Sequence, residues 1–299
     1  MRLSLPALSV WVLLSIPGAA SAQAPDAWWT GPMLANSAGT LPRGHVLAEP
    51  YFYDVASGRS NSYGTRSYLL YGASNRLTIG LIPVLGLRAT HGRAGASGVD
   101  FGDLTLIAQY ELTRAREGGR VPTTALMIQE TLPTGQYDRL SARSGDGIGS
   151  GSYTTTAGLN LQTSVRGPRG HALRVRVNLS GTLSGRARVD GVSVFGTPEA
   201  FRGTASPGAA YFADMSVEYS LRRRFAIAAD VFCSGTGRTL LTGSPPVSSL
   251  RSIHAVGVAP AIELSLTQNL GVLFGVRVIP AGAHTPGSIT PAIAINFVH

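Results

Sequence analysis

The sequence predicts an all-β protein: a transmembrane, antiparallel, up-and-down β-barrel of about 12 strands, of the bacterial outer-membrane type. Apolar and polar residues alternate with a period of two through most of the chain, which indicates strands with one apolar and one polar face. Short turns alternate with long loops, as is usual in such barrels. Only 14% of the 299 residues are charged and 37 are glycine, whereas about 25% of the residues of a soluble domain are charged.

The first residues precede any alternation. Arg2 is followed by an apolar run and by Ala20-Ser21-Ala22, so residues 1–22 are expected to be a secretory signal peptide cut after Ala22. Residues 23–45 are expected to form a periplasmic N-terminal segment, and a segment that enters the lumen is the second placement considered. Residues 46–299 are expected to form the barrel.

The alternation marks the strands in order. It is clearest from Leu173 to Ser180, where odd positions are apolar and even positions are polar. We expect strands at 46–56, 64–73, 76–88, 101–114, 121–133, 151–166, 171–184, 209–221, 224–235, 251–266, 270–280 and 287–298. We expect long loops, all at one end of the barrel, at 89–100, 134–150, 185–208 and 236–250.

Two tyrosines support a sheet that spans a membrane. Tyr211 and Tyr219 fall on the same apolar face, about 26 Å apart along a strand. A strand tilt of about 40° reduces this separation to roughly 20 Å, close to the roughly 25 Å apolar band between the aromatic girdles of outer-membrane barrels.

The composition excludes several classes of protein. All 25 basic residues are arginine and the formal net charge is +9, but the arginines are spread over every segment, which argues for solvated loops and membrane-interface contacts rather than nucleic-acid binding. A single cysteine, Cys233, leaves no intrachain disulfide. The six histidines are scattered without zinc-ligand spacing, and no metal or cofactor is expected.

Five stretches carry a family resemblance. They are GTLPRGHVLAEPYFY (39–53), YGASNRLTIGLIP (71–83), FGDLTLIAQYELTR (101–114), QETLPTGQYDRL (129–140) and GIGSGSYTTTAGL (147–159). They resemble the outer-membrane transporter family named for the meta-pathway of phenol degradation. The resemblance implies a 12-stranded type of barrel, in the outer membrane of a Gram-negative bacterium, that passes aromatic or other small hydrophobic compounds and has no catalytic residue.

The last residues depart from the usual ending of such barrels. Outer-membrane barrels commonly end on an aromatic residue that the assembly machinery reads, whereas here Phe297 lies two places before the end, on the expected lipid face. The expected partners are the barrel-assembly machinery, outer-membrane lipids and lipopolysaccharide, and a small hydrophobic solute, but not nucleic acid.

Charged residues on the expected lumen face are the candidates for function. Besides Asp103 and Glu111, which also face inward, the candidates for a constriction are Glu49, Tyr51, Arg174, Arg176, Asp214, Glu218, Asp230, Glu263 and Arg277. Glu218 is expected within cross-strand reach of Arg174 and Arg176. These charges either satisfy one another and fill a narrow barrel or frame a constriction that selects solutes.

Prolines inside strands form a second group of candidates. Pro50, Pro83, Pro260 and Pro291 each remove a ladder hydrogen bond and imply a bulge or a local break. Pro50 and Pro291 lie in the first and last strands, which must meet to close the barrel. The two interpretations are ordinary bulges or a weakened seam through which a hydrophobic solute leaves sideways.

Three functions are compared. The first is a porin-like channel for passive uptake of small, hydrophobic and aromatic compounds, and the second is a structural or adhesive barrel that acts through its long surface loops. The third is a lipid-modifying enzyme, for which Ser252 and His254 are the nearest approach to a nucleophile and its base. No acid or amide is placed to orient His254, so we favour a protein that is not an enzyme.

Overall fold

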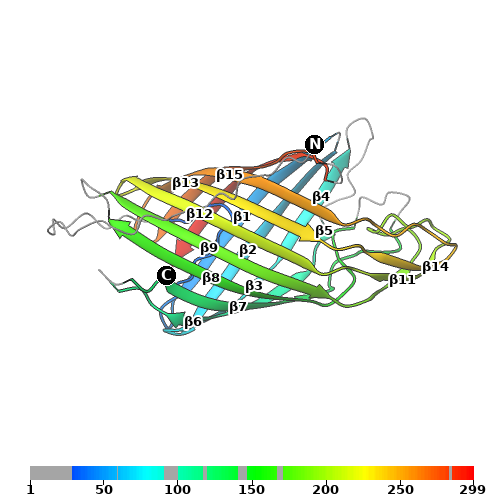
Figure 1. Ribbon diagram of the computed structural model, residues 1–299, viewed down its shortest axis with the longest axis horizontal. Coiled ribbons are helices and arrows are strands. Elements are labelled where there is room, and N and C mark those ends of the chain that lie inside the picture. The colour runs from blue at the N-terminus through cyan, green and yellow to red at the C-terminus, as the bar shows by residue number, and fades with distance from the viewer. Residues whose placement is uncertain are drawn as a thin grey trace, which may run out of the picture.

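The computed structural model describes residues 29–58, 60–90, 100–116, 120–140, 147–166, 171–282 and 285–299. The expected signal peptide lies outside these residues. The main sheet closes on itself, because β1 pairs antiparallel with both β2 and β17 (Figure 1). Its strands are β1 (Val46–Ser57), β2 (Ser60–Ser74), β3 (Leu77–Ile82), β4 (Val84–Thr90), β5 (Asp100–Phe101), β6 (Leu104–Thr113), β7 (Thr123–Leu132), β8 (Thr154–Arg166), β9 (Ala172–Ser184), β12 (Ala210–Arg222), β13 (Phe225–Thr236), β15 (Ile253–Ser265), β16 (Leu270–Ile279) and β17 (Ser288–Val298).

Two of the spanning strands are interrupted. β3 and β4 pair with successive parts of β2 on either side of Pro83, and β5 and β6 pair with β4 and β3 on either side of Gly102 and Asp103. Each pair therefore counts as one strand of the wall, and the 14-stranded sheet is a 12-strand barrel. The predicted fold class is confirmed, and the break expected at Pro83 divides 76–88. The break at Gly102 and Asp103 within 101–114 was not expected.

The barrel is inverted relative to a soluble protein. On β9 the apolar Leu179 and Leu183 are 47% and 70% exposed, whereas Arg176 and Asn178 are only 6% and 4% exposed. Because successive side chains of a strand point to opposite faces, the apolar residues face outward and the polar ones face the lumen. None of the described residues forms a helix that is long and apolar enough to cross a membrane.

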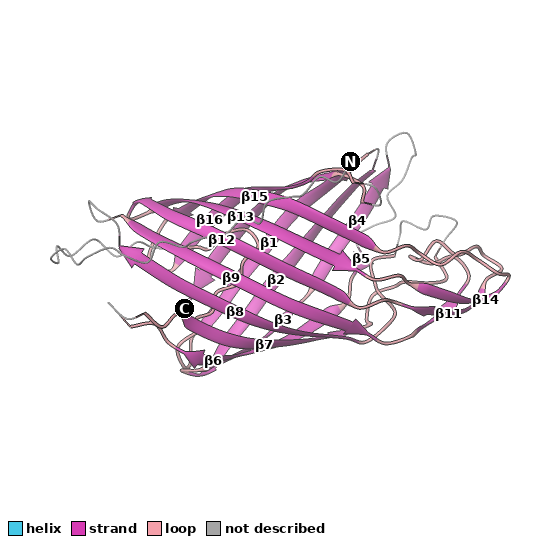
Figure 2. Ribbon diagram, in the orientation of Figure 1, coloured by secondary structure: helices cyan, strands magenta, loops and turns pink. Residues whose placement is uncertain are grey.

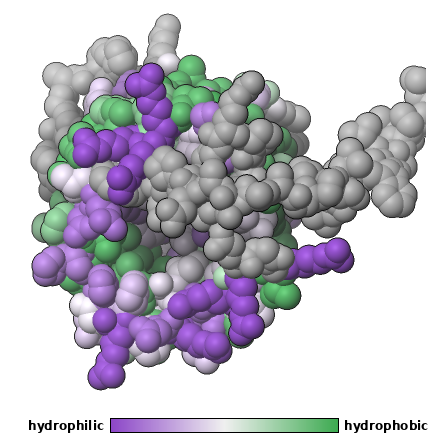
Figure 3. Space-filling model, turned by 90° about the vertical axis from the view of Figure 1, so that its left-hand side faces the viewer, coloured by the Kyte–Doolittle hydropathy of each residue, from purple (hydrophilic) through white to green (hydrophobic). Residues whose placement is uncertain are grey.

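The two ends of the barrel differ. The connections at 75–76, 223–224 and 266–269 define a short-turn end, and those at 133–153 and 185–209 define a long-loop end. In outer-membrane barrels the short turns face the periplasm. Hydrophilic side chains gather at the short-turn end (Figure 3), where Arg43, Arg76, Arg114 and Arg222 are all exposed.

A small second sheet extends from the long-loop end (Figure 2). It consists of β10 (Ala187–Asp190), β11 (Arg202–Ser206) and β14 (Leu240–Ser244). The expected long loops at 185–208 and 236–250 therefore contain strands that the sequence reading did not identify. The small sheet has its own apolar core around Phe201 and Val189, closed from one side by Tyr137, which allows short strands to persist outside the barrel.

The N-terminal segment also differs from the periplasmic placement expected for 23–45. Its described residues 29–41 take the second placement considered, inside the barrel, with Met33, Ala35 and Ala38 buried. A chain without a neighbouring strand must find other partners for its backbone groups. The polar inner face of the barrel supplies them.

Candidate functional site

The lumen segment, residues 29–41, is held by side chains of the barrel wall. Glu263 on β15 accepts hydrogen bonds from the backbone amides of Thr30 at 2.9 Å and Gly31 at 3.0 Å. Asp230 on β13 accepts hydrogen bonds from the amides of Met33 and Ala35, both at 3.1 Å. The backbone amides of the segment therefore donate to carboxylates of the wall instead of to the carbonyl oxygens of a neighbouring strand.

The segment then crosses the lumen and returns to the short-turn end. The amide of Asn36 donates to Asn178 on β9, and the side chain of Gln109 on β6 donates to the carbonyl oxygen of Ser37 at 3.0 Å. The amide of Leu41 donates to the hydroxyl of Thr78 on β3 at 2.9 Å. The segment therefore contacts most of the wall before it enters β1.

A buried charge ladder lies against the segment. Arg174 stands directly opposite Glu218 in the β9–β12 pairing and hydrogen-bonds to its carboxylate. Arg176 lies 3.1 Å from the same carboxylate and donates to the carbonyl oxygen of Ala35 at 2.8 Å. The guanidinium of Arg174 also lies 4.5 Å from the centre of the Trp29 ring. The ladder therefore fixes the segment from the other side.

Small residues of the wall make room for the segment. Met33 packs in one apolar cluster with Ala228, Ala259 and Ala261. At Gly271 on β16, an added Cβ would lie 1.8 Å from the methyl carbon of Thr30, so a larger residue would require the Thr30 side chain to move.

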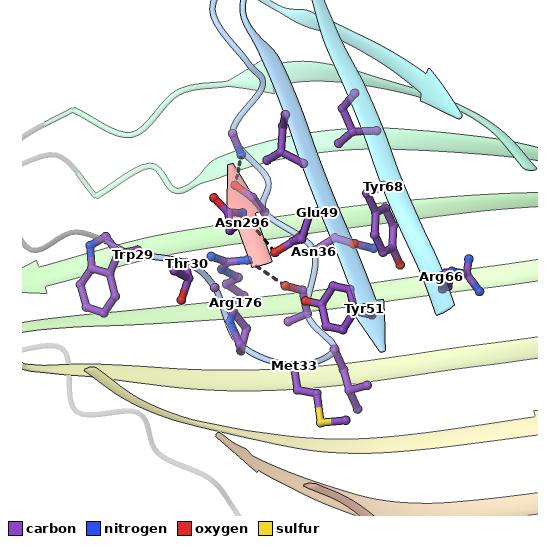
Figure 4. A pocket seen from close by; sticks show the side chains of 18 of the residues that line it. Trp29, Thr30, Met33, Asn36, Glu49, Tyr51, Arg66, Tyr68, Arg176 and Asn296 are labelled. Carbon is purple, nitrogen blue, oxygen red and sulfur yellow. Dashed lines mark hydrogen bonds between the residues drawn. The ribbon is translucent and has the colours of Figure 1, made fainter. Parts of the chain in front are cut away.

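A cavity of about 680 Å³ remains between the segment and the opposite wall. That wall consists of β1, β2, β16 and β17. It carries Tyr51 and Tyr68 (Figure 4), and Tyr53 also lines the cavity. The rings of Tyr51 and Tyr68 meet edge to face at 6.0 Å. Deeper in the cavity, Glu49 accepts a hydrogen bond from Asn296 at 3.1 Å.

The lumen candidates from the sequence all lie on the inner side, but in two groups. Those on β9, β12, β13 and β15 contact or surround the lumen segment: Arg174, Arg176, Asp214, Glu218, Asp230 and Glu263. Glu49, Tyr51 and Arg277 lie on the opposite wall and line the cavity. Sequence reasoning missed Met33 and Arg66, although the small lumen-facing residues that accompany carboxylates on β13 and β15 were a signal that something occupies the lumen. Tyr53 was expected on the lumen face, and it does line the cavity.

The prolines interrupt the wall that borders the cavity. Between β1 and β17 the ladder pairs Ala48 with Phe297, resumes at Tyr51 and Ala294, and skips again beside Pro291. Between β15 and β16 it passes from Val258 to Ala261, omitting Pro260. Ser67 of β2 lies between two of these prolines. It pairs with Pro50, and its amide donates to the carbonyl oxygen of Pro83 at 3.2 Å.

Asp103, which was also assigned inward, joins two of the stretches that carry the family resemblance. Its carboxylate accepts hydrogen bonds from the amide of Gly135 at 2.9 Å and from the amide of Ser150 at 2.7 Å. The hydroxyl of Thr134 donates to the carbonyl oxygen of Gly102 at 3.2 Å. These stretches therefore anchor a long loop to the barrel rather than line the cavity.

The residues considered for an esterase lie elsewhere. His254 is exposed, and its ring tilts against that of Tyr211 with centroids 6.2 Å apart. A ring pair on the outer face of a barrel is typical of an aromatic girdle. Among the described residues, no group of three His, Cys, Asp or Glu side chains could hold a metal ion.

Comparison with solved structures shows the same fold in one outer-membrane channel. The outer-membrane channel COG4313 from Pseudomonas putida F1 superposes with a TM-score of 0.66 at 16% identity, over 89% of this chain and 100% of that one. The KdgM porin in complex with disordered oligogalacturonate gives a TM-score of 0.47 at 8% identity, over 84% of this chain and 98% of that one.

The sequence comparisons give the family. No protein with a curated description matches the chain. The family described as "Putative MetA-pathway of phenol degradation" matches residues 34–281, which is most of the chain and includes the greater part of the lumen segment. The protein is therefore a β-barrel of the outer-membrane type that belongs to this family.

Proposed function

We propose that the protein lets small hydrophobic compounds, aromatic ones among them, cross the outer membrane by passive diffusion. The observation that carries this proposal is the cavity of about 680 Å³ between the lumen segment and the wall of β1, β2, β16 and β17. Binding sites for small molecules have volumes of about 300–1,000 Å³. The cavity is large enough for a one- or two-ring compound and too narrow for a wide aqueous pore.

The lining of the cavity supports an aromatic solute. Tyr51, Tyr53 and Tyr68 present their rings from two neighbouring strands, and aromatic rings prefer offset or edge-to-face neighbours. Leu34 and Met33 supply apolar contacts from the lumen segment. The name of the family, which refers to phenol degradation, agrees with this class of solute.

An uptake measurement tests the proposal. The refolded protein is placed in vesicles whose outer leaflet contains lipopolysaccharide, and entry of 2-naphthol is followed by its fluorescence against an encapsulated quencher. We expect faster entry than in protein-free vesicles, and we expect Ala292→Phe, which places a ring in the cavity, to abolish the difference. Ala229→Phe adds the same volume on the exposed outer face and should leave entry unchanged. Equal entry with and without the protein would refute the proposal.

The small outer sheet favours a second candidate, adhesion through the surface loops. Asp190 forms an ion pair with Arg202 within the sheet, and a second one with Arg139 ties the sheet to the neighbouring loop. Phe201→Ala would remove the centre of its core and should abolish binding to a surface partner while leaving solute entry intact. Loss of 2-naphthol entry in that variant would instead link the sheet to transport.

Export by a signal peptide, insertion by the barrel-assembly machinery and contact with lipopolysaccharide are part of the same proposal. Phe297 is 46% exposed on the outer face and pairs with Ala48 of β1 at the closing seam. It is thus available to an assembly factor that reads the last strand. Phe297→Ala should lower the yield of folded barrel in the membrane without changing uptake per folded molecule.

A further inference from the structure

The cavity holds more positive charge than its own residues neutralise. Its ionisable lining residues are Glu49, Arg66, Arg174, Arg176 and Arg277, apart from the tyrosines. Arg174 and Arg176 share Glu218. Among the described residues, no carboxylate lies within ion-pair distance of Arg66 or Arg277, and both remain as uncompensated cations.

Arg277 has donor capacity to spare. It lies on β16 opposite Thr290 of β17, and one terminal nitrogen donates to the Thr290 hydroxyl at 3.4 Å. Its Nε is buried and has no hydrogen-bond partner. A buried donor is normally paired, because desolvation without a partner is costly. An acceptor that enters the cavity would relieve this cost.

Arg66 approaches the same place from β2. Its guanidinium lies 5.7 Å from the centre of the Tyr68 ring, and its Cα is the partner of that of Tyr51. Tyr53 of β1 pairs with Gly64, two residues before Arg66 on β2, and with Ala292 of β17, whose partner Gly275 lies two residues before Arg277 on β16. The two arginines therefore lie on either side of Tyr53 along the wall, and all three residues line the cavity.

A glycine on β2 leaves the space that the Tyr53 ring occupies. A Cβ at Gly64, its Cα partner, would lie 2.7 Å from the Tyr53 hydroxyl oxygen. The ring therefore lies over the neighbouring strand, with the edge-to-face pair of Tyr51 and Tyr68 beside it. One part of the cavity is therefore cationic, and the neighbouring part is lined by aromatic rings.

We infer that the preferred solutes are aromatic carboxylates, with the carboxylate received by Arg277 and Arg66 at the level of Tyr53 and the ring by Tyr51 and Tyr68. The planar guanidinium of arginine matches a carboxylate with paired N–H donors. A purely hydrophobic solute would leave both cations unpaired. This inference rests on the proposed function, because it names the chemical class that the same cavity selects.

Calorimetric titration of the refolded protein tests the inference with three probes that share one ring system. They are 2-naphthoate, neutral 2-naphthol and cationic 2-naphthylmethylamine, each corrected for partition into detergent micelles. We expect 2-naphthoate to bind most tightly and the amine most weakly. We expect Arg277→Met to weaken 2-naphthoate binding about tenfold or more, as for loss of a charge-assisted hydrogen bond, and to change 2-naphthol binding less than twofold.

The controls separate this inference from the proposed function. Arg188→Met, at an exposed position of the small sheet, should leave all three affinities unchanged, and Arg277→Lys should retain part of the preference for 2-naphthoate. Equal affinities of the wild-type protein for the three probes would overturn the inference even if Arg277→Met fails to fold. Entry of 2-naphthol with no preference for 2-naphthoate would leave the proposed function standing, whereas binding of neither, with no entry, would remove both. If 2-naphthalenesulfonate binds as tightly as 2-naphthoate, selection of carboxylates is overturned and the preferred class is aromatic oxyanions in general.

Discussion

The carboxylate of Asp230 accepts a hydrogen bond from the backbone amide of Met33 at 3.1 Å, across a sequence separation of 197 residues. The same carboxylate accepts the amide of Ala35 at 3.1 Å. One side chain of the barrel wall thus holds the middle of the lumen segment. The cavity is the space that remains between this segment and the wall that carries the tyrosines.

Asp230→Asn should loosen the lumen segment without unfolding the barrel. An asparagine oxygen can accept one of the two amide bonds, but its NH2 group faces the other amide donor, and an unpaired buried amide costs about 1–3 kcal/mol. The backbone ladders of β13 to β12 and β15 do not involve this side chain. We expect higher single-channel conductance and faster proteolysis near residue 33. Asp54→Asn, on the outer face, is the matched control, and unchanged conductance in Asp230→Asn would contradict the expectation.

Gly271→Ala should displace the segment at its entry into the lumen. The added Cβ would lie 1.8 Å from Cγ2 of Thr30, so the Thr30 side chain must move, and its hydroxyl bond to Glu263 moves with it. We expect a larger open-channel current than that of the wild-type protein. Gly181→Ala on β9 is the control, because nothing lies within 4 Å of its added Cβ. A wild-type current in Gly271→Ala would show that the segment does not limit conduction.

The charge ladder should set ion selectivity. Replacing both Arg174 and Arg176 by alanine removes two positive charges from the lumen, but it leaves Glu218, which is 0% exposed, without its partners. An unpaired buried charge destabilises a protein by about 3–5 kcal/mol, so Glu218→Gln is added. We expect the triple variant to fold and to show a lower preference for anions in bilayer reversal-potential measurements. An unchanged reversal potential would remove the two arginines from any selectivity role.

The seam between β1 and β17 should matter if solutes leave sideways. Pro50→Val with Pro291→Val restores two backbone donors where the ladder is interrupted. A continuous seam should slow 2-naphthol entry while heat resistance of the barrel stays equal or rises. Pro260→Val repairs the β15–β16 pairing instead and serves as the comparison. Full entry in the double variant would count against a side exit and in favour of ordinary bulges.

Much of the fold follows from local patterns. Alternation from Leu173 to Ser180 predicts β9 and its two faces because neighbouring side chains of a strand always point in opposite directions. The breaks beside Pro83 and Pro260 follow from the missing amide hydrogen of proline. Short strands such as β10 carry too few residues for alternation to identify them, and their core depends on Phe201 and Tyr137, which are distant in sequence.

The sequence alone determined the barrel, its strand order, the sidedness of its charges and its family, because these depend on a period of two and on recognisable stretches. Only the tertiary structure decided what occupies the lumen. The lumen segment has no periodicity, since its amides bond to Glu263 and Asp230 rather than to a neighbouring strand. The charges of the inner face therefore divide into those that hold this segment and those, Arg66 and Arg277, that remain open to a solute, and that division arises only when the barrel closes.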